Sequence, residues 1–138
     1  MSNQEEASAG DARITACHHM AICAHDIDAA RHFYGELLAL VELERPPEIA
    51  KNFRSAWYLL GSSELHVVEF KDFQPLDSPL GPHIAVTTSD FDAMTAQIAA
   101  RGGKFAFGPG EGFDGVRRAV IHDPTGNTLE ITAASLRA

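Results

Sequence analysis

Basic residues are scarce in this sequence. Its 138 residues include 11 lysines and arginines against 19 aspartates and glutamates, so the net charge is -8 with histidine neutral. Binding to nucleic acid requires clustered cations that replace the counterions around the phosphates, and the few cations of this chain are scattered. We therefore expect no nucleic-acid partner.

Long apolar runs are also missing, and there are only two cysteines. No segment approaches the roughly 18 consecutive apolar residues that suggest a membrane-spanning helix, and the first residues lack the basic and apolar parts of a signal peptide. Cys17 and Cys23 fall in one predicted strand, where six steps of about 3.3 Å place them ~20 Å apart, too far for a disulfide. We expect a cytoplasmic protein with reduced thiols, no membrane partner and a disordered tail over residues 1–13.

An internal repeat organises the rest of the chain. An offset of 64 residues aligns HMAICAHDIDAA (19–30) with HIAVTTSDFDAM (83–94) without a gap, so that His19 meets His83. The same offset carries ELHV (64–67) onto TLEI (128–131), so that His66 meets Glu130. Matches near both ends of a segment at one offset indicate a duplicated module of about 50 residues.

Each copy has the pattern of a βαβββ module. Alternating side-chain character opens each copy, as in a strand, and helical spacing of apolar residues follows an aspartate or serine that can cap a helix. The predicted strands lie near residues 17–24, 40–44, 54–60 and 64–70 in the first copy and near 83–87, 104–107, 117–122 and 128–132 in the second.

Two segments rich in turn-forming residues complete this organisation. Residues 71–82 contain three prolines and are the expected linker, and residues 108–115 contain four glycines and are an expected mobile loop. We therefore predict an α+β protein with a single domain over residues 14–133. Its two tandem modules are predicted to cover residues 14–70 and 83–133.

Four residues near the equivalent ends of the two modules could ligate a metal. They are His19, His66, His83 and Glu130. A lone histidine on a strand face is more often a core or rim residue, but unrelated histidines have no reason to recur in register at both ends of a repeat. Imidazole nitrogens and a carboxylate oxygen suit Zn, Ni, Fe, Co or Mn, so the set predicts a site for one divalent transition metal.

Other residues are candidates for substrate binding. Arg54 and Arg118 could hold an anionic group through bidentate hydrogen bonds, although each could equally be a solvated charge. Tyr58 and His122 could line a pocket, and core packing is the alternative for Tyr58.

Three quoted segments resemble the vicinal oxygen chelate superfamily, which includes glyoxalase I, fosfomycin resistance proteins, extradiol dioxygenases and bleomycin resistance proteins. HMAICAHDIDAARHFYGELLAL is similar to the first strand and helix of the family, GPHIAVTTSDFDA to its second opening strand, and VIHDPTGNTLEIT to its closing segment. Two positions depart from the family pattern. Ala39 follows Leu38 where the family has glycine, and His66 stands where glyoxalase I has a carboxylate.

The resemblance implies a glyoxalase-like fold, with curved mixed sheets around a metal-binding cleft. It implies that His19, His66, His83 and Glu130 are the metal ligands and that Glu130 is also the catalytic, proton-transferring group. It further implies a homodimer in which each site takes ligands from both subunits, although pairing of the two modules within one chain remains open.

Three functions are compatible with these features. The leading hypothesis is a metal-dependent enzyme of the glyoxalase type, a lyase or isomerase that resembles lactoylglutathione lyase and chelates two neighbouring oxygens of a small substrate. The second is an Fe(II) dioxygenase of the extradiol kind, in which two histidines and a glutamate bind the iron. The third is a metal-free protein that sequesters a drug, as bleomycin resistance proteins do.

Overall fold

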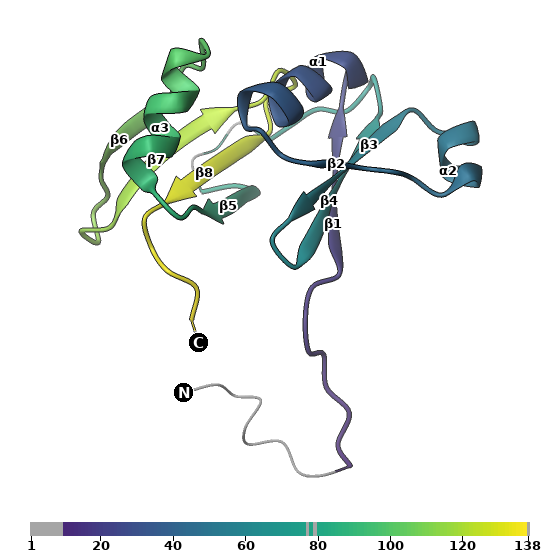
Figure 1. Cartoon of the computed structure of the whole chain (residues 1–138), viewed down its shortest axis with the longest axis horizontal. Coiled ribbons are helices and arrows are strands. Elements are labelled where there is room, and N and C mark those ends of the chain that lie inside the picture. The colour runs from purple at the N-terminus through teal and green to yellow at the C-terminus, as the bar shows by residue number, and fades with distance from the viewer. Residues whose placement is uncertain (1–9, 77, 79, 138) are drawn as a thin grey trace.

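The chain folds into two modules, each with one four-stranded mixed sheet (Figure 1). This computed structural model describes residues 10–76, 78 and 80–137. Part of the expected tail, residues 1–9, lies outside the described residues, and residues 10–18 form no helix or strand. The predicted α+β class and tandem module organisation are confirmed.

The first module has the strand order β1-β4-β3-β2, with β1 parallel to β4. Its elements are β1 (His19–Ala24), α1 (Ile27–Arg31), η2 (His32–Leu37), β2 (Glu42–Leu43), α2 (Pro47–Asn52), β3 (Ser55–Leu60) and β4 (Ser63–Glu69). Asp26 begins α1, because its side chain accepts a hydrogen bond from the Asp28 amide. The helix continues as the π-helical segment η2, in which the Leu38 amide donates to the Phe33 carbonyl.

The second module repeats this topology in the order β5-β8-β7-β6. Its elements are β5 (His83–Thr87), α3 (Phe91–Ala100), β6 (Phe107–Glu111), β7 (Arg117–His122) and β8 (Thr128–Thr132). The last two strands have the predicted bounds. The prediction of a mobile loop is wrong for residues 108–111, because they belong to β6 and face β7 in the sheet. Glycine and proline disfavour a central strand, but β6 is an edge strand with an irregular register, where both are tolerated.

Strand alternation gives each sheet a core face and an open face. Leu65 on β4 and its repeat equivalent Leu129 on β8 are 1% and 2% exposed, and both belong to the core. Side chains one residue away point to the opposite face. The open faces therefore include the four residues predicted as metal ligands, namely His19, His66, His83 and Glu130.

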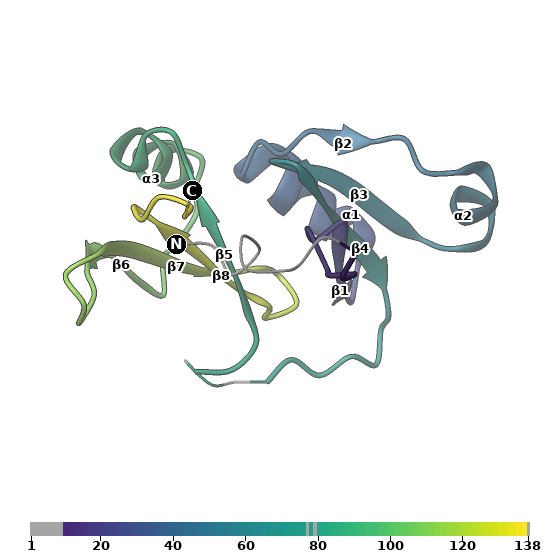
Figure 2. The same ribbon diagram turned by 90° about the horizontal axis from the view of Figure 1, so that it is seen from below.

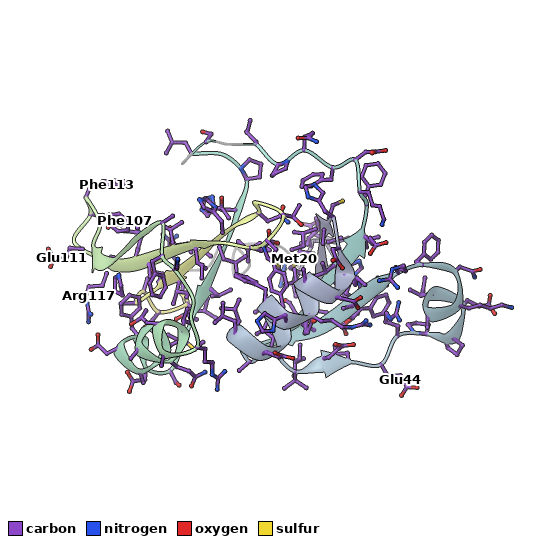
Figure 3. The ribbon with its side chains drawn as sticks, turned by 90° about the horizontal axis from the view of Figure 1, so that it is seen from above. Met20, Glu44, Phe107, Glu111, Phe113 and Arg117 are labelled. Atoms are coloured by element: carbon purple, nitrogen blue, oxygen red, sulfur yellow. The ribbon has the colours of Figure 1, made fainter. Side chains whose placement is uncertain are left out.

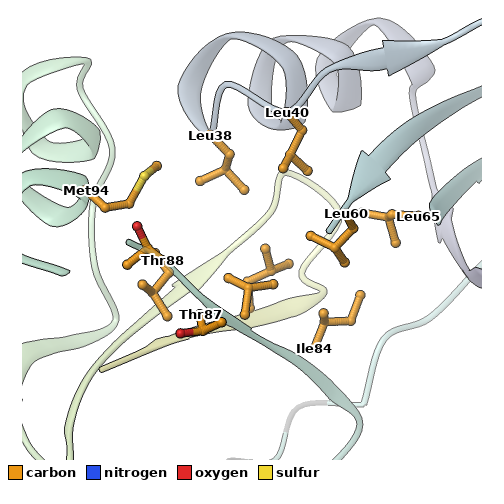
Figure 4. A pocket seen from close by; sticks show the side chains of 11 residues that line it. Leu38, Leu40, Leu60, Leu65, Ile84, Thr87, Thr88 and Met94 are labelled. Atoms are coloured by element: carbon orange, nitrogen blue, oxygen red, sulfur yellow. The ribbon is translucent and has the colours of Figure 1, made fainter. Parts of the chain in front are cut away.

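The two modules pack through their core faces within one chain. Leu65 and Leu129 line the same small apolar cavity of about 130 Å³ (Figure 4), so equivalent residues of the repeat meet between the sheets. Hydrogen bonds also join the modules, since Tyr34 Oη donates to Asp123 and Asn127 Nδ2 donates to the Cys23 carbonyl. The described parts of the linker between β4 and β5 run along the outside (Figure 2). The open faces therefore do not lie at this contact.

Ala39 adopts an unusual backbone conformation after η2. Its φ of 59° lies in the left-handed region, and among the described residues it is the one non-glycine residue with a positive φ. Glycine adopts this conformation without the steric cost of a Cβ atom. This explains why the resembling family has glycine at the position of Ala39.

No helix in the part of the chain that the structure describes has the length and apolar character needed to cross a membrane.

Both tyrosines of the chain should resist ionisation while the protein is folded. Tyr34 and Tyr58 are fully buried. Burial, with a smaller effect of Glu42, raises the pKa of Tyr58 to about 12, and burial together with Asp123 raises that of Tyr34 further. In unfolded chains tyrosine has a pKa of about 10. The tyrosines of the unfolded state therefore lose their protons first. Their effect on the free energy of unfolding is fully favourable to the folded state below about pH 10 and is lost as the pH rises towards 12.

An alkaline titration checks this expectation. Tyrosinate absorbance should stay low at pH 10–11 while circular dichroism remains native, and the melting temperature should fall over the same range. Half-ionisation of one tyrosine near pH 10 in the folded protein would contradict it.

Candidate functional site

The first half of the candidate site lies on the open face of β1 and β4. The imidazole rings of His19 and His66 stack with centroids 4.3 Å apart. The other face of the His66 ring stacks on Trp57, with centroids 3.7 Å apart and planes within 3°. The strand register places Glu64 directly opposite His19. We call His19, Glu64 and His66 the β1–β4 half-site.

A hydrogen bond links two members of this half-site. His66 Nε2 lies 2.9 Å from Glu64 Oε1, and because an ionised carboxylate only accepts, Nε2 is the donor. This bond is the main cause that lowers the pKa of the Glu64 carboxyl, and His18 and His19 lower it further. Glu64 is therefore an anion at neutral pH, held beside a group of imidazoles.

The second half lies on the open face of β5 and β8, in a large cavity. His83 and Glu130 both line this cavity, which has a volume of about 1010 Å³. We call these two residues the β5–β8 half-site. The aromatic part of the lining comes from Phe107 and Phe113, at one end of the molecule (Figure 3).

Arg118 lines this cavity and forms ion pairs with two carboxylates. Its guanidinium Nε lies 3.4 Å from Glu130 Oε2, and Nη2 donates to Asp114 at 2.6 Å. The hydrogen bonds from Arg118 hold the pKa of Asp114 well below its usual range. His122 lies on the same face of the sheet, with Nδ1 3.2 Å from the Thr128 hydroxyl. The structure thus brings two of the predicted substrate-binding residues, Arg118 and His122, to the cavity of His83 and Glu130.

The four predicted metal ligands form two separate pairs within one chain. The described lining of the large cavity includes no residue of β1 or β4. Across residues 10–76, 78 and 80–137, no group of three or more histidine, cysteine, aspartate or glutamate side chains could hold a metal ion together. Each pair alone offers fewer protein ligands than the three or four that zinc usually has.

Two other predicted substrate-binding residues lie away from both half-sites. Arg54 is ion-paired with Glu69 at 3.1 Å and with Asp28 at 3.7 Å, near the start of α1. Tyr58 lies on the core face of β3 and is fully buried. It therefore has no exposed surface that a substrate in solution could contact.

The sequence prediction left out two residues that the structure places beside His66. Glu64 shares its side-chain direction because it lies two residues earlier on β4, a signal present in the sequence. Trp57 is the cross-strand partner of His66, and this contact could be found only from the register of β3 against β4.

Comparisons with known proteins agree with this fold. The sequence model of the Glyoxalase/Bleomycin resistance protein/Dioxygenase superfamily matches residues 16–131. No curated protein matches the sequence significantly.

Several solved structures share the fold. A glyoxalase/bleomycin resistance protein/dioxygenase from Alicyclobacillus acidocaldarius is 23% identical, with a TM-score of 0.70 over 85% of this chain and 89% of its own. A glyoxalase/dioxygenase from Nostoc punctiforme is 22% identical, with a TM-score of 0.69 over 90% and 97%. The lactoylglutathione lyase of Agrobacterium tumefaciens is 20% identical, with a TM-score of 0.67 over 87% and 94%. At these identities the likeness concerns the fold alone.

Proposed function

The chain belongs to the Glyoxalase/Bleomycin resistance protein/Dioxygenase superfamily, and from this membership we propose that it is a divalent-metal-dependent enzyme of the glyoxalase type. The observation that supports the proposal best is the repetition of donor residues. His19 and His83 begin the first strand of their modules, and both lie exposed on an open face. Histidine and carboxylate donors fit Zn, Ni, Fe, Co or Mn.

The residues of the large cavity suggest individual roles in such a reaction. A divalent metal held by His19, His66, His83 and Glu130 would supply Lewis-acid chemistry towards two neighbouring oxygens of a small substrate. Glu130 is the proposed proton-transferring group, since its carboxylate lines the cavity in which a substrate would bind. Arg118 holds Glu130 in place and could bind an anionic part of the substrate, and His122 adds a hydrogen-bonding ring at the same wall.

A complete metal site is proposed to form between two copies of the chain. The modules of one chain use their core faces to pack against each other, so the open faces remain for another partner. In a homodimer, the β1–β4 half-site of one subunit would meet the β5–β8 half-site of the other. Two equivalent sites per dimer follow from twofold symmetry.

Metal analysis of protein purified without chelators tests the proposal. We expect close to one equivalent of a divalent transition metal per chain, and at least about tenfold weaker rebinding in His83→Ala, because donor removal costs at least as much as loss of an outer-shell partner. Loss of Glu44, an exposed carboxylate after β2 (Figure 3), should leave metal content unchanged. Protein without metal that also fails to bind added Zn, Ni, Fe, Co or Mn would refute the proposal.

A second candidate is a binding protein for a cationic aromatic compound. The large cavity combines exposed Phe107 and Phe113 with the carboxylates of Glu111 and Glu130. Aromatic faces and carboxylates both attract cations. This function would retain its ligand affinity after the metal is removed with a chelator, whereas the proposed enzyme would lose substrate binding through the metal.

A further inference from the structure

Arg118 divides its guanidinium unequally between two carboxylates. Its Nη1 and Nη2 donate to the two oxygens of Asp114, with 2.6 Å between Nη2 and Oδ2. Its Nε lies 3.4 Å from Glu130 Oε2, which exceeds the roughly 2.7–2.9 Å of a charge-assisted hydrogen bond. Arg118 is therefore bound mainly to the loop residue Asp114, although Glu130 lies on the adjacent strand β8.

The loop between β6 and β7 fixes the Asp114 carboxylate. The Val116 amide donates to Asp114 Oδ1 at 3.1 Å, and the Gly112 amide donates to the Val116 carbonyl at 2.8 Å. Gly112 also leaves room for the guanidinium, because a Cβ atom at this position would overlap Arg118 Nη1. The loop therefore presents a preformed acceptor to Arg118.

The pair between Arg118 and Asp114 leaves the Glu130 carboxylate available to other partners. The planar fork of arginine fits a carboxylate through two parallel hydrogen bonds. Without Asp114, the same fork would turn to Glu130 and occupy both of its oxygens. The side chains of Arg118 and Glu130 are only 22% and 20% exposed, so salt and water would screen this pair weakly. A metal at Glu130 would then have to displace the arginine first.

We propose that Asp114 is a positioning residue that keeps Arg118 from closing on Glu130, so that the Glu130 carboxylate stays free to bind the metal. This inference rests on the proposed metal site. Asp114 is not among the described residues that line the cavity, so it acts through Arg118. Gly112 supports the same role, because a larger residue there would push the guanidinium away from Asp114.

A double-mutant cycle with Zn²⁺ as the only added ligand tests the inference on the full chain. Asp114→Asn preserves the size of the side chain, but it lacks the second acceptor oxygen and the charge that bind the guanidinium. We expect its affinity for Zn²⁺ to fall at least about tenfold, as for loss of an outer-shell partner. Arg118→Met removes the competing guanidinium, and in this background the Asp114 substitution should change the affinity by less than about twofold.

The cycle separates this role from a merely structural one. An affinity of Asp114→Asn within about twofold of the parent overturns the inference, and so does an equal loss in both backgrounds, because Arg118 would then not transmit the effect. If the parent binds no Zn²⁺, the proposed metal site fails and the inference fails with it. Asp72→Asn removes a charge from another exposed segment and should leave the affinity unchanged.

Nuclear magnetic resonance of the metal-free protein gives a second readout, in which Arg118→Met assigns the Nε–H signal of Arg118. This signal should move to lower field in Asp114→Asn, because a shorter hydrogen bond to Glu130 replaces the 3.4 Å contact. Melting curves establish that each variant is folded. An unchanged Nε–H signal in the folded Asp114→Asn variant overturns the inference.

Discussion

Replacing Asp123 with alanine is expected to lower the free energy of unfolding by about 3–5 kcal/mol, a large part of the total stability of a small domain. Asp123 is 5% exposed, and its carboxylate accepts five hydrogen bonds. Three come from the amides of Thr125, Gly126 and Asn127, one from the Asn127 side chain and one from Tyr34 Oη at 2.6 Å. Alanine leaves the amides of Thr125 and Asn127 and the Tyr34 hydroxyl without this acceptor, and a buried unpaired donor costs about 1–3 kcal/mol before relaxation. The Gly126 amide keeps the Asp123 backbone carbonyl, and Asn127 Nδ2 keeps the Cys23 carbonyl.

The position of Asp123 makes this loss larger than that of an ordinary turn residue. The turn between β7 and β8 lies against the end of β1, where Asn127 Nδ2 donates to the Cys23 carbonyl and Thr125 accepts from the His25 amide. Asp123 fixes this turn and also binds Tyr34 in the first module. Its removal therefore weakens one module and the contact between the two.

Urea unfolding followed by circular dichroism measures the effect, with two comparison variants. Tyr34→Phe removes only the hydroxyl donor and should cost about 1 kcal/mol. Asp72→Ala removes an exposed carboxylate after β4 and should stay within about 0.5 kcal/mol of the parent. A cost for Asp123→Ala no greater than that for Tyr34→Phe would show that the turn hydrogen bonds contribute little.

The fold could be predicted because its strongest signals are repeated in the sequence. The offset that aligns His19 with His83 also aligns the core residues Leu65 and Leu129, so the two modules and their alternating strands could be identified together. Helix α2 was missed because none of its residues is buried, and an exposed six-residue helix has no apolar periodicity. The strand predicted near residues 104–107 lies too early, because β6 covers Phe107–Glu111 and backbone pairing at a sheet edge accepts glycines that sequence patterns assign to loops.

The candidate site could be predicted only in part. The residue types and their recurrence predict His19, His66, His83 and Glu130 as metal donors, but the partners of each side chain depend on strand register. Trp57 and Tyr58 are adjacent, and the sequence does not indicate which of the two faces the core. The register of β3 against β4 places Trp57 on His66 and leaves Tyr58 buried. For the same reason the contact between Glu64 and His66 had to be seen in the structure.

Mixed dimers of His19→Ala and His83→Ala are expected to regain metal binding that each variant alone loses. If each site combines the β1–β4 half-site of one subunit with the β5–β8 half-site of the other, every site of either homodimer lacks one imidazole. In the mixed dimer, one site lacks both imidazoles and the other has the complete donor set. Random assortment makes about half of the dimers mixed, so about one quarter of all sites should recover full affinity.

The experiment requires that the subunits be exchanged before Zn²⁺ binding is measured. The two variants are mixed at equal concentration after partial denaturation and refolding, and each variant refolded alone is the control. Recovery of about one quarter of the tight sites supports sites that are shared between chains. Sites formed within one chain would give no recovery at all, because every chain in the mixture lacks one donor. Since the modules already pack through Leu65 and Leu129 on their core faces, that result would require the open faces of one chain to meet by a rearrangement of this packing.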